Sequence, residues 1–257
     1  MRADVRPSPV APALAPDAAP RLGLLALATD LVVEGDARRV LPADVALHVT
    51  RVAFENPTTP ENLRRMAPRL AAAAELLVPG LPLAAIGYAC TAASVAIGDA
   101  EVTATIAGAR PGVPVVTPAG AACAGLAALG ARRIALVTPY LPETTAPMAR
   151  FFERAGLEVV TAQCLGLADD RDIARIAPET IRAAAAAADA PDVEAVFLSC
   201  TNLRALGEIA GLEARLGKPV LCSNQALLWQ MLHHAGRAPA PGAWGQLFEV
   251  SPLERAA

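Results

Sequence analysis

Several features that would assign a common enzyme class are missing from this sequence. It has one lysine, Lys218, which precedes Pro219 at the expected start of a strand, a poor position for a Schiff base with pyridoxal phosphate. No G-x-G-x-x-G motif follows the first strand, and the chain has neither a P-loop nor a G-x-S-x-G elbow. These absences argue against dinucleotide enzymes, nucleotide enzymes and serine hydrolases. We expect no cofactor.

Basic clusters and long apolar runs are also missing. The formal net charge is −3, whereas a nucleic-acid surface needs a positive stripe. No apolar run approaches the roughly 20 residues of a membrane span. Residues 1–20 are rich in proline and alanine without the pattern of a signal peptide, so we expect a flexible tail. The sequence predicts a cytoplasmic protein with no nucleic-acid or membrane partner.

The cysteines do not form a disulfide framework. Five is an odd number, and they are scattered through a mid-sized chain, which favours a reducing compartment. None belongs to a C-x-x-C pair, and only three histidines are present, so we expect no metal site. The cysteines are Cys90, Cys123, Cys164, Cys200 and Cys222.

Short apolar strands alternate with alanine-rich helical stretches along the chain, a pattern typical of an α/β fold with parallel sheets. In the first half we expect strands at 22–28, 45–52, 83–88 and 113–116, and helices at 60–77, 92–107 and 119–129. In the second half we expect strands at 133–137, 157–162, 194–198 and 219–221, and helices at 143–154, 177–188, 202–215 and 224–234.

The two halves share a register. Arg21 opens the first strand and Cys90 follows 69 positions later, while Arg132 opens the matching strand and Cys200 follows 68 positions later. Each cysteine is followed by threonine, and each Cys-Thr pair leads through a helix to a proline-led strand. The repetition predicts two similar Rossmann-like lobes related by a pseudo-twofold axis.

Ligands of open α/β sheets bind beyond the carboxyl ends of the strands, where both Cys-Thr pairs stand. We therefore expect the active site in a cleft between the lobes. The expected division is a tail at 1–20, a first lobe made of 21–117 plus 223–250, and a second lobe at 118–222.

Two thiols on opposite sides of one carbon are suited to inversion, because one as thiolate removes a proton while the other returns one. Cys90 and Cys200 each precede a predicted helix, whose N-terminus favours a thiolate. The developing enolate needs hydrogen-bond donors. The candidate donors are Thr91, Thr117, Tyr140, Thr201 and Asn202.

The alternative for any single cysteine is packing, since free cysteine is among the most buried residue types. Cys123 and Cys164 lack the duplicated context and are interpreted as structural. For Cys222 the neighbouring Ser223 is either a helix cap or a ligand contact. His233 and His234 suit the end of a helix. The segment 54–60 is predicted to be a loop that can close over the cleft.

With these residues, the chain resembles the aspartate/glutamate racemase superfamily over about residues 21–250. The segments 198–204 and 217–226 resemble the branch that contains maleate isomerases, arylmalonate decarboxylases and the ectoine-utilisation EutA proteins. Residues 27–30 and 137–140 fit EutA best.

This resemblance implies a two-domain fold with the site between domains, no cofactor and frequent homodimers. It implies that Cys90 and Cys200 are the acid/base or nucleophilic pair. Tyr140 and Asn202 would contact substrate, and Thr29 with Asp30 would line the entrance. The maleate isomerases have asparagine where Asp30 aligns, so maleate is disfavoured here.

Four hypotheses for function follow. The leading one is a cofactor-independent two-cysteine racemase or epimerase acting on a small carboxylate, with ectoine or hydroxyectoine utilisation as the implied setting. The second is cis-trans isomerisation through a cysteine adduct. The third is decarboxylation of the arylmalonate type, against which Cys90 argues. The fourth is a non-catalytic binding protein, because two lobes around a cleft also describe small-molecule binders.

Overall fold

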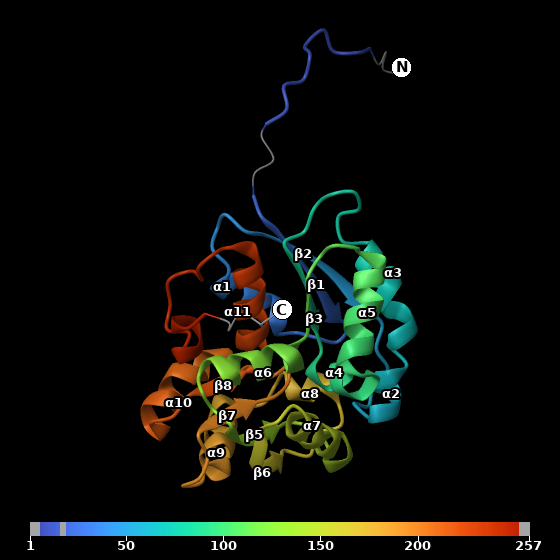
Figure 1. Ribbon diagram of the computed structural model, residues 1–257. Helices are drawn as coiled ribbons and strands as arrows, with labels where there is room; N and C mark the ends of the chain where they lie inside the picture. The colour runs from blue at the N-terminus through green and yellow to red at the C-terminus, as the bar shows by residue number, and fades with distance from the viewer. Residues whose placement is uncertain (1–5, 16–18, 252–257) are drawn as a thin grey trace.

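Two four-stranded parallel sheets form the frame of the molecule (Figure 1). The computed structural model describes residues 6–15 and 19–251. The first sheet consists of β1 (Arg21–Leu27), β2 (Ala46–Val52), β3 (Ala85–Ala89) and β4 (Val115–Val116). The second sheet consists of β5 (Arg133–Thr138), β6 (Glu158–Cys164), β7 (Ala195–Leu198) and β8 (Val220–Cys222).

The two sheets have the same strand order. It is β2-β1-β3-β4 in the first sheet and β6-β5-β7-β8 in the second, so each sheet places its first and third strands at the centre. All pairings are parallel, with one irregularity in β5 between Ile134 and Ala135. The predicted α/β fold with two similar lobes is confirmed.

Helices cover both sheets. In the first half they are α1 (Val33–Val40), α2 (Pro60–Arg64), α3 (Leu70–Glu75), α4 (Thr91–Ile97), α5 (Asp99–Ala109) and α6 (Pro118–Ala128). In the second half they are α7 (Pro142–Arg154), α8 (Asp170–Ile173), α9 (Pro178–Ala188), α10 (Ile209–Leu216) and α11 (Ser223–Ala235). Short 3₁₀ helices lie at Ala67–Arg69, Leu206–Glu208 and Gln246–Glu249.

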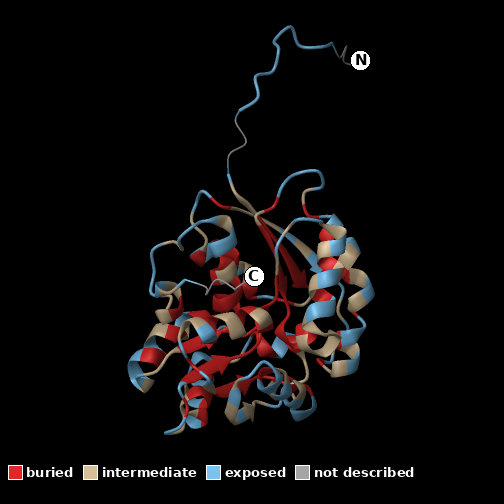
Figure 2. Cartoon of the chain, viewed as in Figure 1, coloured by how far each residue is buried: buried red, intermediate tan, exposed pale blue. Residues whose placement is uncertain are grey.

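The core follows the central strands β1, β3, β5 and β7, which are buried (Figure 2), whereas the edge strands β2 and β6 are mostly half-buried or exposed. β3 and β7 are buried at every position, because helices cover both of their faces. Helix α11 comes last in the chain, yet it packs against β3 of the first sheet. At Gly87 in β3 an added Cβ would lie 2.5 Å from the sulfur of Met231, so glycine lets α11 approach this closely.

Helix α6 lies between the two sheets, in contact with α11, β3 and β8 (Figure 1). The return of α11 to the first sheet agrees with the predicted lobe of 21–117 plus 223–250, although the exact lobe boundaries stay a prediction. Of the predicted tail at 1–20, residues 6–15 are exposed and form no helix or strand. Residues 1–5 and 16–18 lie outside the described part.

Three predicted helices are wrong in detail. The helix expected at 60–77 is interrupted near Pro68, whose ring cannot continue an α-helix. The helix expected at 92–107 is divided at Gly98, which has φ +119°. The helix expected at 202–215 begins only at Ile209. Helices α1 and α8 were not predicted, because each is short and carries several charges.

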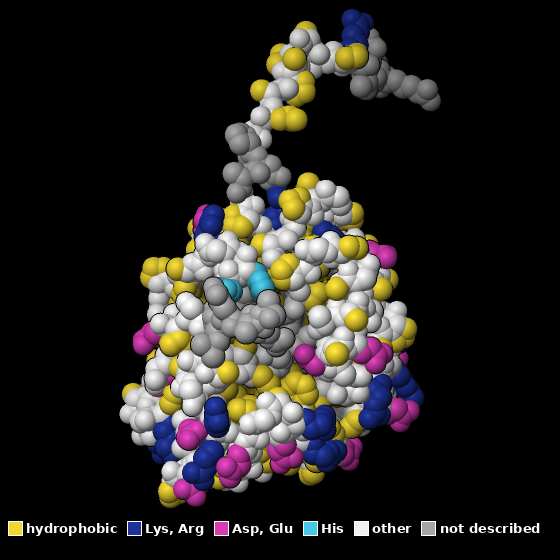
Figure 3. Space-filling model, viewed as in Figure 1, with side chains coloured by type: hydrophobic (Ala, Val, Ile, Leu, Met, Phe, Trp, Pro, Cys, Tyr) yellow, Lys and Arg dark blue, Asp and Glu magenta, His cyan; other side chains and the backbone are white. Residues whose placement is uncertain are grey.

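Charges of both signs lie at the surface. On the face shown in Figure 3, basic and acidic side chains alternate along the lower edge, over the second lobe. Ion pairs of the second lobe include Arg133 with Asp192 at 3.2 Å and Arg182 with Glu179 at 2.8 Å. Within the described residues, no helix has the length and apolar character needed to cross a bilayer.

Candidate active site

Cys90 follows the buried strand β3 and is the N-cap of α4. Its backbone is extended, with φ −154°, and the N–H of Ala93 donates to its sulfur at 3.4 Å. The predicted position at a strand end and a helix N-terminus is confirmed for this cysteine. Backbone N–H groups of the first helical turn therefore face the sulfur and favour its anion.

Cys200 stands beyond the end of the central strand β7, but no α-helix starts there. Its φ is +136°, a conformation that L residues rarely adopt, and the next residues form a turn. The N–H of Asn202 donates to the Cys200 sulfur at 3.3 Å. The expectation of a helix N-terminus at Cys200 is thus wrong, and a tight turn supplies the N–H donor instead.

The turn has a physical reason, because its side chains bond across to the other lobe. The Thr201 hydroxyl donates to the carbonyl oxygen of Ala89 at 3.0 Å. The Asn202 side-chain oxygen accepts from the N–H of Leu31 at 2.8 Å. A helix starting at residue 202 would turn these groups away from their partners. Sequence propensity misses this, since the partners are more than 100 positions distant.

The two thiols lie close enough for their charges to interact. The charge of Cys90 raises the pKa of the Cys200 thiol. The charges of both cysteines raise the pKa of Tyr140, whose hydroxyl hydrogen-bonds to the Cys200 sulfur. Cys90 is 5% exposed and Cys200 is 4% exposed. The structure therefore brings together the paired thiols of the two lobes and encloses them at the lobe interface.

Burial dominates the protonation of these groups. It raises the pKa of Cys90 and of Cys200 well above the ordinary value, against the opposing effect of the nearby N–H donors. The negative charge of Asp170 raises both pKa values further. Without a ligand, both groups are therefore neutral thiols at pH 7.

For Ser223 the sequence left open a helix cap or a ligand contact, and the structure shows its side chain bonded beside the two cysteines. Its hydroxyl oxygen accepts from the backbone N–H of Cys200 at 2.9 Å and from the Thr91 hydroxyl at 2.7 Å. The α11 cap is Cys222, whose N–H donates to the Gln225 side chain at 3.2 Å. Ser223 thus connects the segments that follow both cysteines. Its place directly after a proline-led strand was the available signal.

Asp170 was not predicted as a site residue. Its carboxyl oxygen Oδ2 accepts from the Thr29 hydroxyl at 2.5 Å and from the Asn202 amide at 3.0 Å. Burial raises its pKa. The only signal in the sequence was an Asp-Asp pair before a short helix, which ordinarily marks a helix start.

Asp30 is a buried carboxyl that follows β1. Its Oδ1 accepts from the N–H groups of Val32 and Val33, both at 2.8 Å, whereas its Oδ2 is buried without a hydrogen-bond partner. Burial raises its pKa from the ordinary 3.8 to about 7, and the charge of Asp170 contributes to the increase. Among the predicted entrance residues, Asp30 is 2% exposed and Thr29 is partly buried.

Other candidates have partners away from the thiols. The Thr117 hydroxyl caps α6 by accepting from the Gly120 N–H at 3.1 Å and donates to Asp99. Its predicted contact with substrate stays a prediction. His233 and His234 occupy the last turn of α11, as expected.

Three arginines, which as a residue type can pair with a carboxylate, are engaged in other contacts. Arg51 donates to the carbonyl oxygens of Leu27 and Asp30, both at 2.9 Å. Arg204 donates to the carbonyl oxygen of Ala174 at 2.7 Å. Arg39 lies 5.4 Å from the ring centre of Trp244.

The loop at 53–59 crosses from the first lobe to the second. The Asn56 side chain donates to Asp169 at 3.1 Å and accepts from the N–H of Asp170 at 3.1 Å. The N–H of Thr58 donates to the Ala168 carbonyl at 2.7 Å, and its own carbonyl accepts from Thr144 at 2.9 Å. The loop thus bonds to the segment that carries Asp170.

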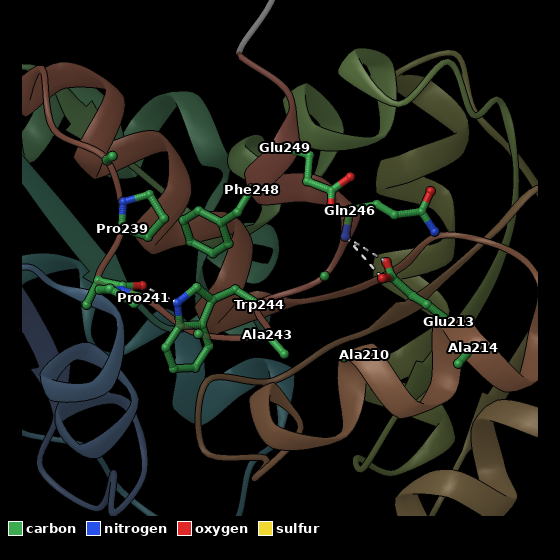
Figure 4. A pocket seen from close by; sticks show the side chains of 14 residues that line it. Ala210, Glu213, Ala214, Pro239, Pro241, Ala243, Trp244, Gln246, Phe248 and Glu249 are labelled. Carbon is green, nitrogen blue, oxygen red and sulfur yellow. Dashed lines mark hydrogen bonds between the residues drawn. The ribbon is translucent and has the colours of Figure 1, made fainter.

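An open cavity of about 650 Å³ lies elsewhere, between α10 and the segment 238–249 (Figure 4). Trp244 and Phe248 supply its aromatic lining. The Glu213 carboxylate accepts from the N–H of Gln246 at 3.0 and 3.2 Å. The lining contains no cysteine, so this cavity is separate from the thiol pair. Among the described residues, no three His, Cys, Asp or Glu side chains are grouped to hold a metal ion.

Known proteins share this architecture. The Pseudomonas putida S16 maleate isomerase, solved with maleate, superposes with a TM-score of 0.82 at 26% identity, covering 92% of this chain and 100% of that chain. The Nocardia farcinica maleate cis-trans isomerase, solved with a covalently bound succinylcysteine intermediate, has a TM-score of 0.82 at 27% identity, with coverages of 89% and 98%.

Sequence comparison agrees with the structural likeness. The arylmalonate decarboxylase of Bordetella bronchiseptica is 36% identical over 146 residues, which are 54% of this chain and 60% of that protein. The match therefore spans less than two thirds of that relative. The family model for arylmalonate decarboxylase matches residues 70–248. The chain therefore belongs to the arylmalonate decarboxylase family, in which maleate isomerases also fall and in which catalysis is cysteine-based.

Proposed function

We propose that the protein is a cofactor-independent isomerase that inverts a proton-bearing carbon of a small carboxylate, with Cys90 and Cys200 as the two acid/base groups. One observation carries this proposal: the two thiols follow the equivalent central strands β3 and β7 of opposite lobes, and their charges act on each other. A carbon between them would meet one sulfur on each face.

The reaction has two proton transfers. One cysteine, as thiolate, takes the proton from the carbon, and the opposite thiol gives its proton to the other face. The exchange leaves the pair reversed, ready for the enantiomer. For this, one buried thiol must first ionise, so bound substrate has to favour the anion more than the empty site does.

The surrounding donors suit this task. Tyr140 hydrogen-bonds to the Cys200 sulfur, and the N–H groups of Ala93 and Asn202 each meet one of the two sulfurs. Thr91, Thr201 and Asn202 are proposed to contact the substrate. Thr29 and Asp30 are proposed to line its entrance. The predicted homodimer is also kept as a proposal.

Deuterium incorporation tests the proposed reaction. Candidate acids, including ectoine-derived acids, maleate and amino acids, are incubated with the protein in deuterated water and separated on a chiral column. We expect inversion with deuterium at the inverted carbon. Cys90→Ala and Cys200→Ala should each abolish it, whereas Cys164→Ala, a partly buried thiol at the end of β6, should not. Inversion without label would refute proton transfer.

Cis-trans isomerisation through a thiol adduct is the second candidate. It is favoured by the succinylcysteine intermediate of the Nocardia farcinica relative. In that route a thiolate adds to an alkene, the adduct rotates about its single bond, and the thiolate leaves again. Incubation with maleate followed by denaturation and intact-mass measurement would then show a succinyl adduct on one cysteine. Inversion of a saturated acid without such an adduct favours the first proposal.

A further inference from the structure

Two buried carboxyl groups adjoin the thiol pair from opposite lobes. Asp30 is 2% exposed and Asp170 is 4% exposed, and the negative charge of each raises the pKa of the Cys90 thiol. Their own charges repel each other. Two carboxyls at one buried site are costly unless a positive group accompanies them.

The structure supplies donors to one of these carboxyls but leaves the other incomplete. Asp170 is held by Thr29 and Asn202. Asp30 Oδ2 is buried without a hydrogen-bond partner, and the single hydroxyl proton of the nearby Thr201 is donated to the Ala89 carbonyl oxygen at 3.0 Å. A buried carboxyl oxygen near Cys90 that has no hydrogen-bond partner can accept a hydrogen bond from a ligand.

Among the described residues, no cationic side chain neutralises this pair. Within the described part of the chain, neither Asp30 nor Asp170 forms an ion pair with arginine, lysine or histidine. Arg51 donates to the backbone carbonyl oxygen of Asp30 at 2.9 Å, and its guanidinium pairs with Glu34. The site therefore has two carboxyl groups, neutral donors and two thiols.

We propose that the substrate of this site carries a cationic nitrogen, an ammonium group beside the reacting carbon, which binds to the carboxyls of Asp30 and Asp170. This inference rests on the proposed function and narrows its substrate from a small carboxylate to a zwitterion. The nitrogen donates to Asp30 Oδ2 and neutralises the repulsion between the two carboxyls.

The cation also has a chemical role. A positive charge next to the carbon stabilises the carbanion that forms when the proton leaves, and it favours a thiolate at either cysteine. The cation thus promotes ionisation of a thiol, which burial disfavours in the ligand-free site. A dianion such as maleate would instead add negative charge to a site that already holds two carboxyls.

Thiol labelling with charged reagents tests the preference without knowledge of the substrate. The protein is treated with 2-aminoethyl methanethiosulfonate or 2-sulfonatoethyl methanethiosulfonate, and the rate at each cysteine is followed by peptide mass mapping. Cys164 in the same sample corrects for the intrinsic reactivity of the reagents. We expect the corrected cation-to-anion rate ratio at Cys90 and Cys200 to exceed one by about 10-fold or more.

The variants localise the effect. Asp30→Asn and Asp170→Asn should each lower that ratio several-fold, whereas Asp172→Asn, which removes an exposed carboxyl from the same helix as Asp170, should leave it unchanged. If neither reagent modifies Cys90 or Cys200, the ratio is measured in the Asn56→Ala variant. In this variant the loop at 53–59 lacks the side-chain hydrogen bonds to Asp169 and Asp170. A ratio near one, or a ratio that both asparagine variants leave unchanged, overturns the proposal.

Isosteric acids separate this inference from the proposed function. Alanine and proline are compared with lactate and tetrahydrofuran-2-carboxylate, which lack the cationic nitrogen, by deuterium exchange at the carbon next to the carboxylate. Faster exchange in the oxygen compounds would overturn the cation site while the two-thiol reaction stands. A high labelling ratio together with inversion that survives Cys90→Ala and Cys200→Ala would leave the cation site standing and remove the proposed function.

Discussion

The hydroxyl of Thr201 donates to the carbonyl oxygen of Ala89 at 3.0 Å, so the residue after one candidate cysteine is bonded to the residue before the other. This hydrogen bond joins the ends of β7 and β3 across the lobe interface. We expect it to hold the segments that carry Cys90 and Cys200 in a fixed relative position.

Thr201→Val should therefore reduce both turnover and stability. Valine keeps the shape but leaves the Ala89 carbonyl unpaired, which costs about 1–3 kcal/mol in the free energy of unfolding. Misplacement of the thiols should lower kcat by roughly 10-fold or more. Thr201→Ser retains the hydroxyl and is the matched control, measured by denaturant unfolding and steady-state kinetics. Equal turnover in the valine and serine variants would contradict the positioning role.

The backbone of Cys200 predicts an unusual ranking of substitutions. At φ +136° a residue with a Cβ is strained, whereas Cys90 at φ −154° is not. Cys200→Gly should therefore be more stable than Cys200→Ala by about 1 kcal/mol. At position 90 the order should reverse, with alanine more stable than glycine by roughly 0.5–1 kcal/mol. Denaturant unfolding of the four variants checks both orders; the same order at both positions would exclude strain at Cys200.

Stability should depend on pH through Asp30. Its pKa is raised on folding from 3.8 to about 7, so the unfolded chain loses this proton first as the pH rises. The neutral form of Asp30 suits the buried site, so the free energy of unfolding is highest below pH 3.8. It falls as the pH rises to about 7, by roughly 4 kcal/mol in total. Asp30→Asn should flatten this part of the stability profile. Urea unfolding between pH 4 and 8 makes the comparison, and parallel profiles for the two proteins would count against a raised pKa.

The loop at 53–59 should control access to the thiols. Asn56 bonds to Asp169 and to the backbone of Asp170, so Asn56→Ala removes the side-chain tie between the loop and the second lobe. We expect the labelling of Cys90 and Cys200 by a neutral thiol reagent to be several-fold faster in this variant. Glu55→Ala is the control, since Glu55 pairs only with Arg65 and Arg69 of its own lobe among the ion pairs described. Equal rates in the two variants would mean that access lies elsewhere.

Much of the fold was predictable because the pattern is local. Each strand is a short apolar run, and the repeated Cys-Thr pair marks the same strand end twice, so the sequence alone predicts two lobes and places Cys90 at a helix N-terminus. These features depend on near neighbours in the chain. The two halves can be matched from the similar number of residues between the first strand and the cysteine in each half.

The rest depended on contacts between distant residues. Cys200 was expected at a helix start, but Thr201 and Asn202 bond to the other lobe and hold a turn. Asp170 reads as an ordinary helix-start carboxyl until Thr29 and Asn202 are seen to hold it at the thiols. Ser223 reads as a cap until its bonds with Thr91 and Cys200 appear. None of these pairings has a local signature.

Enantiomer-specific exchange in the two cysteine variants tests the central claim most directly. For a substrate found by the deuterium screen, each pure enantiomer is incubated in deuterated water with Cys90→Ala or Cys200→Ala. Because each variant retains a thiol on one face only, we predict that neither inverts the carbon and that the two variants exchange the proton of opposite enantiomers. Exchange of the same enantiomer by both variants, or inversion by either one, would contradict a reaction carried out by two thiols on opposite faces.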